Sequence, residues 1–187
     1  MSRGSQAVAG LALAGMLLVG GCGQEKPSDE ATPAPTSSDV PLPTGFDGCN
    51  LPQSLIAAEQ LKNMGEDKNW NSPGSSRKWS GCTWVQSDGF TAGVTVTTIT
   101  LQNILDSPSS TWTIGDRFAI GDRAVVTYSQ PVDDPAEKCM LNVEMSGGSM
   151  EITLLNQPSA RKSKGRHACD IAKSLATQLA PTIPAGS

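Results

Sequence analysis

The N-terminal segment constrains the fold most, because it decides in which compartment the chain folds. Arg3 precedes an apolar run from Ala7 to Val19, and the small pair Gly20-Gly21 and then Cys22 follow. A charged start, an apolar stretch too short to span a bilayer comfortably and a small-residue cleavage site are typical of a signal peptide. A cysteine directly after the cut is what a bacterial lipoprotein signal peptidase requires. We expect removal of residues 1–21 and acylation of Cys22.

This processing would leave a lipid-anchored protein on the extracytoplasmic face of the cell membrane, where more than one acyl chain gives durable anchoring. The alternative is a plain secretory signal with an incidental cysteine at position 22. Residues 22–44 are rich in Pro, Ser and Thr and poor in apolar side chains, which predicts a disordered linker. Residues 45–187 then form a single exported domain of ordinary size.

Charge argues against nucleic acid as a partner, and hydropathy argues against a membrane-spanning helix after the signal peptide. The formal net charge is −4, which does not suit a nucleic-acid-binding protein. No later apolar stretch approaches the length of a membrane-spanning helix.

Four further cysteines predict two disulfides, because an even count in an oxidising compartment is typical of a cross-linked domain. They are Cys49, Cys82, Cys139 and Cys169. A zinc site would place ligands in close pairs, and these cysteines are far apart, so we expect no metal. The hairpin expected between 139 and 155 returns the chain toward Cys139, which favours Cys139–Cys169 and leaves Cys49–Cys82. The pairing Cys49–Cys169 with Cys82–Cys139 stays open.

The chain is expected to begin and end in helices. Asn50 is placed to cap the first helix, whose apolar stripe continues through Leu61 and Met64 and ends at Gly65. Residues 168–180 repeat apolar side chains at helical spacing and stop at Pro181.

Between these helices the pattern becomes strand-like, with turn signals at Asp88-Gly89 and Gly147-Gly148. Val94 and Val96 share one phase while Ile99 and Leu101 take the other, so either a bulge intervenes or both sheet faces are covered. We predict an α+β domain, in which an antiparallel sheet of about five strands carries the N- and C-terminal helices on one face. The expected strands are 78–86, 90–101, 139–144 and 150–155, with either a strand pair or one long interrupted strand at 118–129 and a helical turn at 101–105.

Short motifs follow one another in a specific order along the exported domain. They are Phe46-Asp47-Gly48-Cys49-Asn50-Leu51, Gly81-Cys82-Thr83-Trp84, Ile120-Gly121-Asp122-Arg123-Ala124, a strand opening at Cys139 and a helix starting at Cys169. This series resembles the actinobacterial lipoproteins with domain of unknown function 3558, although Gly48 stands where the family often has proline. The resemblance implies a location in the cell envelope, two disulfides and an α+β fold. The family has no established reaction or ligand, so the resemblance implies no catalytic residue.

Catalytic chemistry is not indicated by the remaining residues. His167 is the only histidine, and no Gly-x-Ser-x-Gly elbow is present to accompany it. Asp133, Asp134 and Glu137 lack EF-hand spacing and are expected in a solvated loop. Trp79 and Trp84 differ by an odd number on one expected strand, so at most one faces a given side. We predict no enzymatic activity, no cofactor and no metal.

A basic loop is the remaining candidate for binding. Arg161, Lys162, Lys164 and Arg166 could contact anionic lipid headgroups, glycan phosphates or an acidic partner surface. The alternative, which the sequence favours, is a solvated connector. The leading hypothesis is a non-enzymatic binding module that meets an unknown envelope protein. The alternative is a carrier that shields a lipid or other apolar ligand between sheet and helix, for which an apolar cavity would be the signature.

Overall fold

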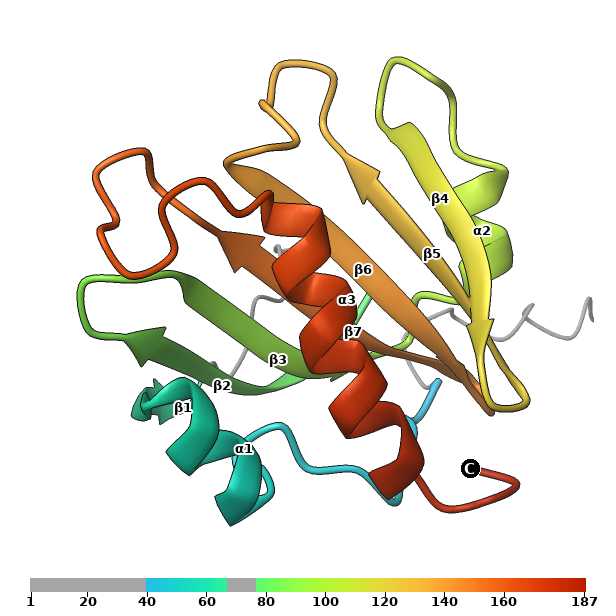
Figure 1. The fold of residues 1–187 in the computed structure, drawn as a ribbon. Coiled ribbons are helices and arrows are strands. Elements are labelled where there is room, and N and C mark those ends of the chain that lie inside the picture. Colours follow the sequence, from blue (N-terminus) through green and yellow to red (C-terminus); the bar gives the residue numbers. More distant parts are fainter. Residues whose placement is uncertain (1–39, 67–76) are drawn as a thin grey trace, which may run out of the picture. The chain divides into compact units, whose positions relative to one another are not determined.

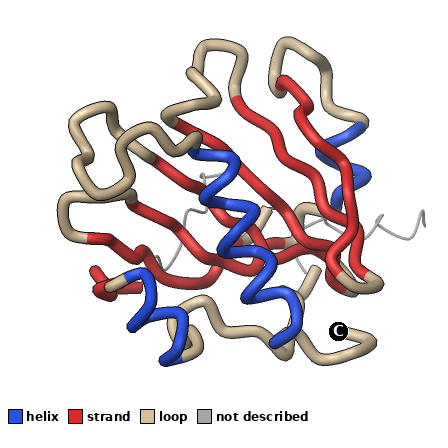
Figure 2. Tube along the Cα trace, in the orientation of Figure 1, coloured by secondary structure: helices blue, strands red, loops and turns tan. Residues whose placement is uncertain are grey.

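One antiparallel sheet of seven strands organises the described part of the chain, in the spatial order β1-β2-β3-β7-β6-β5-β4 (Figures 1 and 2). The computed structural model describes residues 40–66 and 77–187. The predicted signal cleavage, the acylation of Cys22 and most of the predicted linker lie outside those residues. The strands are β1 (Leu61–Glu66), β2 (Trp79–Gln86), β3 (Thr91–Thr97), β4 (Thr113–Ile120), β5 (Arg123–Ser129), β6 (Lys138–Met145) and β7 (Gly148–Leu155).

The sheet has seven strands and not the five expected. The two additional strands are β1, where the first helix was expected to continue, and β4, which precedes β5. Helix α1 (Gln53–Glu59) starts after Pro52 and ends where Gln60 adopts a left-handed φ of 53°. The chain then enters β1 and pairs with β2, so Met64 is 67% exposed and does not continue a helical stripe. The N-cap is Pro52, and the expectation of a cap at Asn50 was therefore wrong.

The second additional strand, β4, precedes β5 in a hairpin. Gly121 takes a positive φ of 62° in its two-residue turn, which allows Ile120 to pair with Arg123. Most β4 side chains are exposed, so the strand lacks the buried alternation by which a strand is recognised in sequence.

Helix α3 (Ala168–Leu179) lies across one face of the sheet against β6 and β7, and α1 packs on the same face nearer β1 (Figure 1). The space between these two helices and the sheet is filled with apolar side chains. The largest fully buried members include Phe90, Leu55, Leu141, Met150, Ile152, Leu154, Ile171, Leu175 and Leu179. Leu42 and Pro43, assigned to the linker by composition, also contact this domain, since Leu42 packs against the core and Pro43 is buried.

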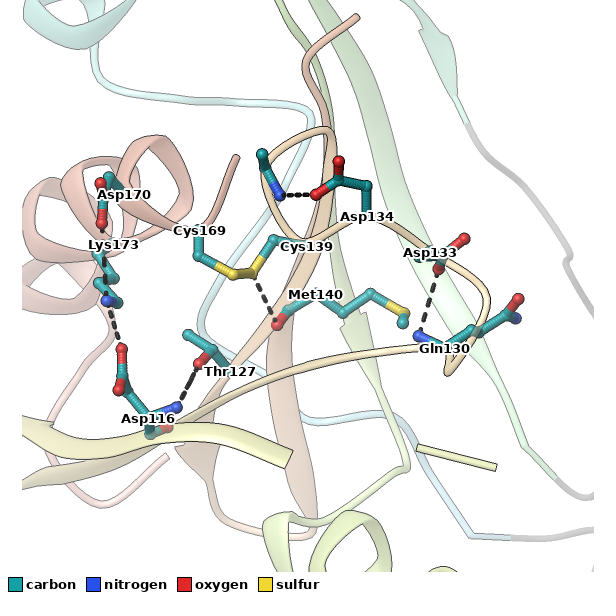
Figure 3. The surroundings of a disulfide bond; sticks show 11 residues. Asp116, Thr127, Gln130, Asp133, Asp134, Cys139, Met140, Cys169, Asp170 and Lys173 are labelled. Atoms are coloured by element: carbon teal, nitrogen blue, oxygen red, sulfur yellow. Dashed lines mark hydrogen bonds and ion pairs between the residues drawn. A yellow bond between two sulfur atoms is a disulfide. The ribbon is translucent and has the colours of Figure 1, made fainter. Parts of the chain in front are cut away.

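Two disulfides attach helical segments to strands on this face. Cys49, just before α1, bonds to Cys82 of β2, and Cys139 of β6 bonds to Cys169 at the start of α3 (Figure 3). This is the connectivity that the hairpin argument favoured. Both cross-links join segments about thirty residues apart and hold the helical layer to the sheet.

The opposite face of the sheet is covered at one end by α2 (Leu101–Leu105), which Thr100 caps. A second, smaller core forms there, in which Ile104 packs with residues of β5 and β6 and with Ile99 and Leu101. Val94 and Val96 belong to the larger core. The expected strand 90–101 was too long, because β3 ends at Thr97. Ile99 and Leu101 lie beyond it and pack in the smaller core, so their change of phase needs no bulge within the strand.

Candidate functional site

The loop of residues 156–167, which joins β7 to α3, is braced by one buried side chain. Asn156 is 5% exposed, and its amide donates to the carbonyls of Ser163 at 3.3 Å and Arg166 at 2.8 Å. The fully buried Ser163 hydroxyl donates back to Asn156 Oδ1. An amide that bonds three times to its own loop fixes the loop's shape. Residues 156–167 therefore have a fixed conformation, although most of them are exposed to solvent as expected for a connector.

Backbone hydrogen bonds attach this loop to two neighbouring segments. The Asn156 N–H donates to the Glu137 carbonyl at 2.6 Å, and the Ala168 N–H donates to the Ala136 carbonyl at 2.9 Å. The Lys162 N–H donates to the Asp88 carbonyl in the β2–β3 turn at 2.8 Å. The turn at 136–137 and the loop consequently form adjacent, fixed surfaces.

Three of the four predicted loop cations have a neighbour within the domain. Arg161 pairs with Asp88 at 2.7 Å, and Lys162 Nζ donates to Gln60 at 2.5 Å. Arg166 lies 3.9 Å from the Glu59 carboxylate and keeps 41% of its side chain exposed.

Lys164 differs from these, because it makes no hydrogen bond or ion pair with any residue that the structure describes. The loop therefore carries one uncommitted cation, Lys164, and one weakly paired cation, Arg166.

A pocket of about 220 Å³ opens between the loop and the 136–137 turn. It brings Lys164 and Arg166 together with Glu137 and His167, whereas Arg161 and Lys162 do not line it. The full lining is Ala136, Glu137, Asn156, Gln157, Pro158, Lys164, Gly165, Arg166 and His167.

Gln157 was not singled out from the sequence, and Glu137 was considered only as one of three carboxylates expected in a solvated loop. The β6–β7 hairpin and the 136–137 turn bring both residues to the pocket, which no local pattern shows. His167 was considered only as a catalytic base, and it lines the pocket as the residue before α3.

The lining contains two cations, one acidic residue, two residues with side-chain amides and a histidine, and no serine, threonine or cysteine. Of the three carboxylates predicted in a solvated loop, Asp133 pairs with Lys138 at 3.1 Å and Asp134 accepts from the Ala136 N–H at 2.9 Å. Within residues 40–66 and 77–187, no three metal-ligating side chains gather into a cluster.

A second polar group, absent from the sequence predictions, lies on the sheet face opposite α3. The Glu151 carboxylate accepts from Thr153 at 3.1 Å and lies 3.3 Å from the Tyr128 hydroxyl. Trp79 and Asn142 also hydrogen-bond to it. Burial raises the pKa of the Glu151 carboxyl above its ordinary value, although these four hydrogen bonds act in the opposite direction.

Tyr128 and Asn142 extend this network across β5, β6 and β7. The Tyr128 hydroxyl donates to Asn142 Oδ1 at 2.9 Å, and Asn142 donates to Ser149 Oγ at 2.6 Å. Burial, and then the charge of Glu151, raise the pKa of Tyr128 well above its usual value. Every polar group in this chain of contacts has a partner, so we interpret it as structural. Trp84, by contrast, lies in the α3-side core and donates to the Gly48 carbonyl at 2.8 Å.

No helix among the described residues is long and apolar enough to cross a membrane. Comparison with curated proteins and with solved structures found no match. A family model does match, over residues 17–182, which is most of the chain. Its extent includes both disulfides, the loop and the pocket. The chain thus belongs to the family described as "Protein of unknown function (DUF3558)".

Proposed function

We propose that this protein is a lipid-anchored lipoprotein of the cell envelope and acts as a non-enzymatic binding module. The observation that carries the binding role is the pocket beside the 156–167 loop, where Lys164 has no partner among the described residues. A cation without an internal partner, in a concave and braced site, is available to an external group.

The anchoring part of the proposal rests on the N-terminal sequence. Arg3, the apolar run 7–19 and Cys22 have the order of a lipoprotein signal, and the resemblance to actinobacterial lipoproteins agrees with it. A domain tethered in this way presents its pocket to molecules of the envelope.

The alternative function, a carrier of an apolar ligand between sheet and helix, gains less support. The space between α3 and the sheet is occupied by side chains such as Leu141, Ile152 and Leu175, each at most 1% exposed. The lining of the pocket beside the loop includes no Leu, Ile, Val, Met or Phe, the residues that usually line a site for an apolar ligand.

Anchoring is tested by fractionation of the producing cell. The wild-type protein is expected in the membrane fraction, with a mature N-terminus at residue 22 that carries fatty acid by mass spectrometry. The Cys22→Ala variant is expected to lose the acyl group and to leave the membrane fraction. A wild-type protein that begins elsewhere and bears no fatty acid would contradict the anchor.

Binding is tested on protein isolated from its own membrane, by native mass spectrometry. We expect a co-purifying small molecule that is lost when Lys164 and Arg166 are both changed to Gln. The matched control changes Lys62 and Arg117 to Gln, because both are exposed and neither lines the pocket. An adduct that survives the pocket variant, or that the control also loses, contradicts binding at this pocket.

A further inference from the structure

We propose that the pocket recognises a phosphate group that is carried next to free hydroxyls, as in a phosphorylated polyol. This inference rests on the proposed binding function and names the chemical class of the ligand. Its three supports are the charge of the lining, the size of the cavity and the placement of Glu137 and Gln157.

The charge of the lining favours an anion. The lining holds two cations, Lys164 and Arg166, and one acidic residue, Glu137, while a second acidic residue, Glu59, lies outside the lining at 3.9 Å from Arg166. Lys164 has no partner among the described residues. Arg166 forms a long ion pair of 3.9 Å with Glu59, and such a partly exposed pair contributes little stability. Charge-assisted hydrogen bonds to phosphate oxygens are therefore open to both side chains without breaking a strong contact.

The size of the cavity favours a small group. A pocket for a drug-sized ligand commonly encloses about 300–1,000 Å³. The volume here is about 220 Å³. A phosphate with a few attached carbons and hydroxyls is of this order, whereas a folded protein segment or an acyl chain is not.

Glu137 decides between a bare phosphate and a phosphate that carries hydroxyls. Glu137 is a lining residue of the same pocket as the cations, and its carboxylate accepts no hydrogen bond from a described residue. A bare phosphate would be repelled by this charge, while a neighbouring hydroxyl would donate to it. The Gln157 amide, which also makes no hydrogen bond with a described residue, offers a second hydroxyl contact.

The walls are formed before a ligand arrives. Asn156 is engaged by Ser163 and Arg166, and the backbone of Asn156 is bonded to Glu137. A preorganised wall reduces the ordering cost that a small ligand must offset. This makes recognition of a small phosphorylated group feasible.

The first experiment titrates the native protein, in detergent micelles, by calorimetry with glycerol 3-phosphate, inorganic phosphate and glycerol. We expect glycerol 3-phosphate to bind more tightly than inorganic phosphate, and glycerol alone to give no heat. Lys164→Gln should weaken glycerol 3-phosphate binding about tenfold, the effect of one charge-assisted contact. Lys62→Gln, with the same charge change on exposed β1, should leave it unchanged.

A second variant tests the hydroxyl contact separately. Glu137→Gln should strengthen binding of inorganic phosphate, because it removes a negative charge that repels the phosphate. The difference in affinity between glycerol 3-phosphate and inorganic phosphate should therefore become smaller. A variant that weakens both ligands equally overturns the assignment of Glu137. Failure of every phosphate probe while the membrane-isolated protein still holds a pocket-dependent adduct overturns the phosphate class and leaves the binding function intact. Loss of both overturns the binding function as well.

Vesicles identify the source of the phosphate. Binding to phosphatidylglycerol vesicles in excess of phosphatidylcholine vesicles, lost in Lys164→Gln and kept in Lys62→Gln, assigns the site to a lipid headgroup. Equal binding to both vesicles, together with tight binding of glycerol 3-phosphate, assigns it to a free or glycan-borne phosphate. Vesicle binding that both variants retain shows that the pocket does not contact the headgroup.

Discussion

The two faces of the sheet are built from neighbouring residues with opposite chemistry. Leu141 and Asn142 are adjacent on β6, and both are fully buried. Leu141 enters the apolar layer beneath α3, while Asn142 enters a hydrogen-bonded network on the other side. Alternation along a strand sends successive side chains to opposite faces, so one strand supplies both environments.

The difference shows that burial on the two faces is stabilised by different means. On the α3 face, close contact between aliphatic side chains is supplemented by two disulfides. On the opposite face, Asn142, Ser149 and Glu151 are stabilised only because each finds hydrogen-bond partners. Loss of volume should therefore dominate on the first face, and loss of a polar partner on the second.

The largest effect is expected from a cavity on the α3 face. Leu141→Ala should lower the free energy of unfolding by about 2–5 kcal/mol, because it removes a fully buried aliphatic side chain. Leu155→Ala, the same change at a position that is 39% exposed on β7, should cost less than about 1 kcal/mol. Urea denaturation measures both. Equal costs would show that the α3 face is not the tightly filled one.

The disulfide between β6 and α3 should contribute a similar amount of stability. Replacing Cys139 and Cys169 together with Ala should lower the free energy of unfolding by about 3–4 kcal/mol in the chain-entropy model, since the cross-link closes a loop of about thirty residues. The double variant of Cys49 and Cys82 is the matched comparison, with a nearly equal loop. If only the first double variant abolishes pocket binding, the start of α3 positions the pocket. If the second also abolishes it, global stability is responsible.

On the network face, Asn142→Ala should cost about 1–3 kcal/mol, because it removes a buried hydrogen-bond partner from Tyr128 and another from Ser149. Asn63→Ala, at an exposed β1 position with one local hydrogen bond, is the control and should cost less than about 0.5 kcal/mol. Thermal unfolding compares the two variants. A cost for Asn142→Ala no larger than that of the control would show that the network carries no stability.

The sequence predicted the apolar, disulfide-linked α3 face of the sheet better than the hydrogen-bonded face opposite. Helix 168–180, the β6–β7 hairpin and the helical turn at 101–105 all follow from strong local signals, and the structure confirms each of them. Strand β1 was missed because Leu61 and Met64 have helical spacing, and only the left-handed conformation of Gln60 breaks the helix. Tertiary pairing with β2 decides this segment, and no local pattern contains it.

The site was predictable only in part, for a related reason. The run of basic residues marked the loop, but sequence could not separate Arg161 and Lys162, which pair outside the pocket, from Lys164 and Arg166, which line it. That division depends on Asp88 and Gln60, which lie far away in the chain. Asn142 and Glu151 were equally hidden, because they become partners only through the register of β6 with β7.

The smallest and most specific effect concerns Glu151. Its pKa is raised by burial above the ordinary value of 4.5, so between that value and the folded pKa the folded state holds a proton that the unfolded chain has released. The contribution of this carboxyl to stability is therefore fully present below pH 4.5 and is lost as the pH rises through the folded pKa. Glu151→Gln stays neutral, so this loss should be absent from the variant.

The measurement is urea unfolding of both proteins from pH 4 to pH 8, where the difference between them isolates Glu151 from the other acids. The variant should gain stability relative to wild type as the pH rises. Glu144→Gln, at an exposed β6 position, is the control and should give a flat difference. A variant of Glu151 that loses stability relative to wild type as the pH rises would mean that Thr153, Trp79, Tyr128 and Asn142 outweigh burial. The hydrogen bonds on this face would then stabilise the ionised Glu151 carboxylate in the folded state.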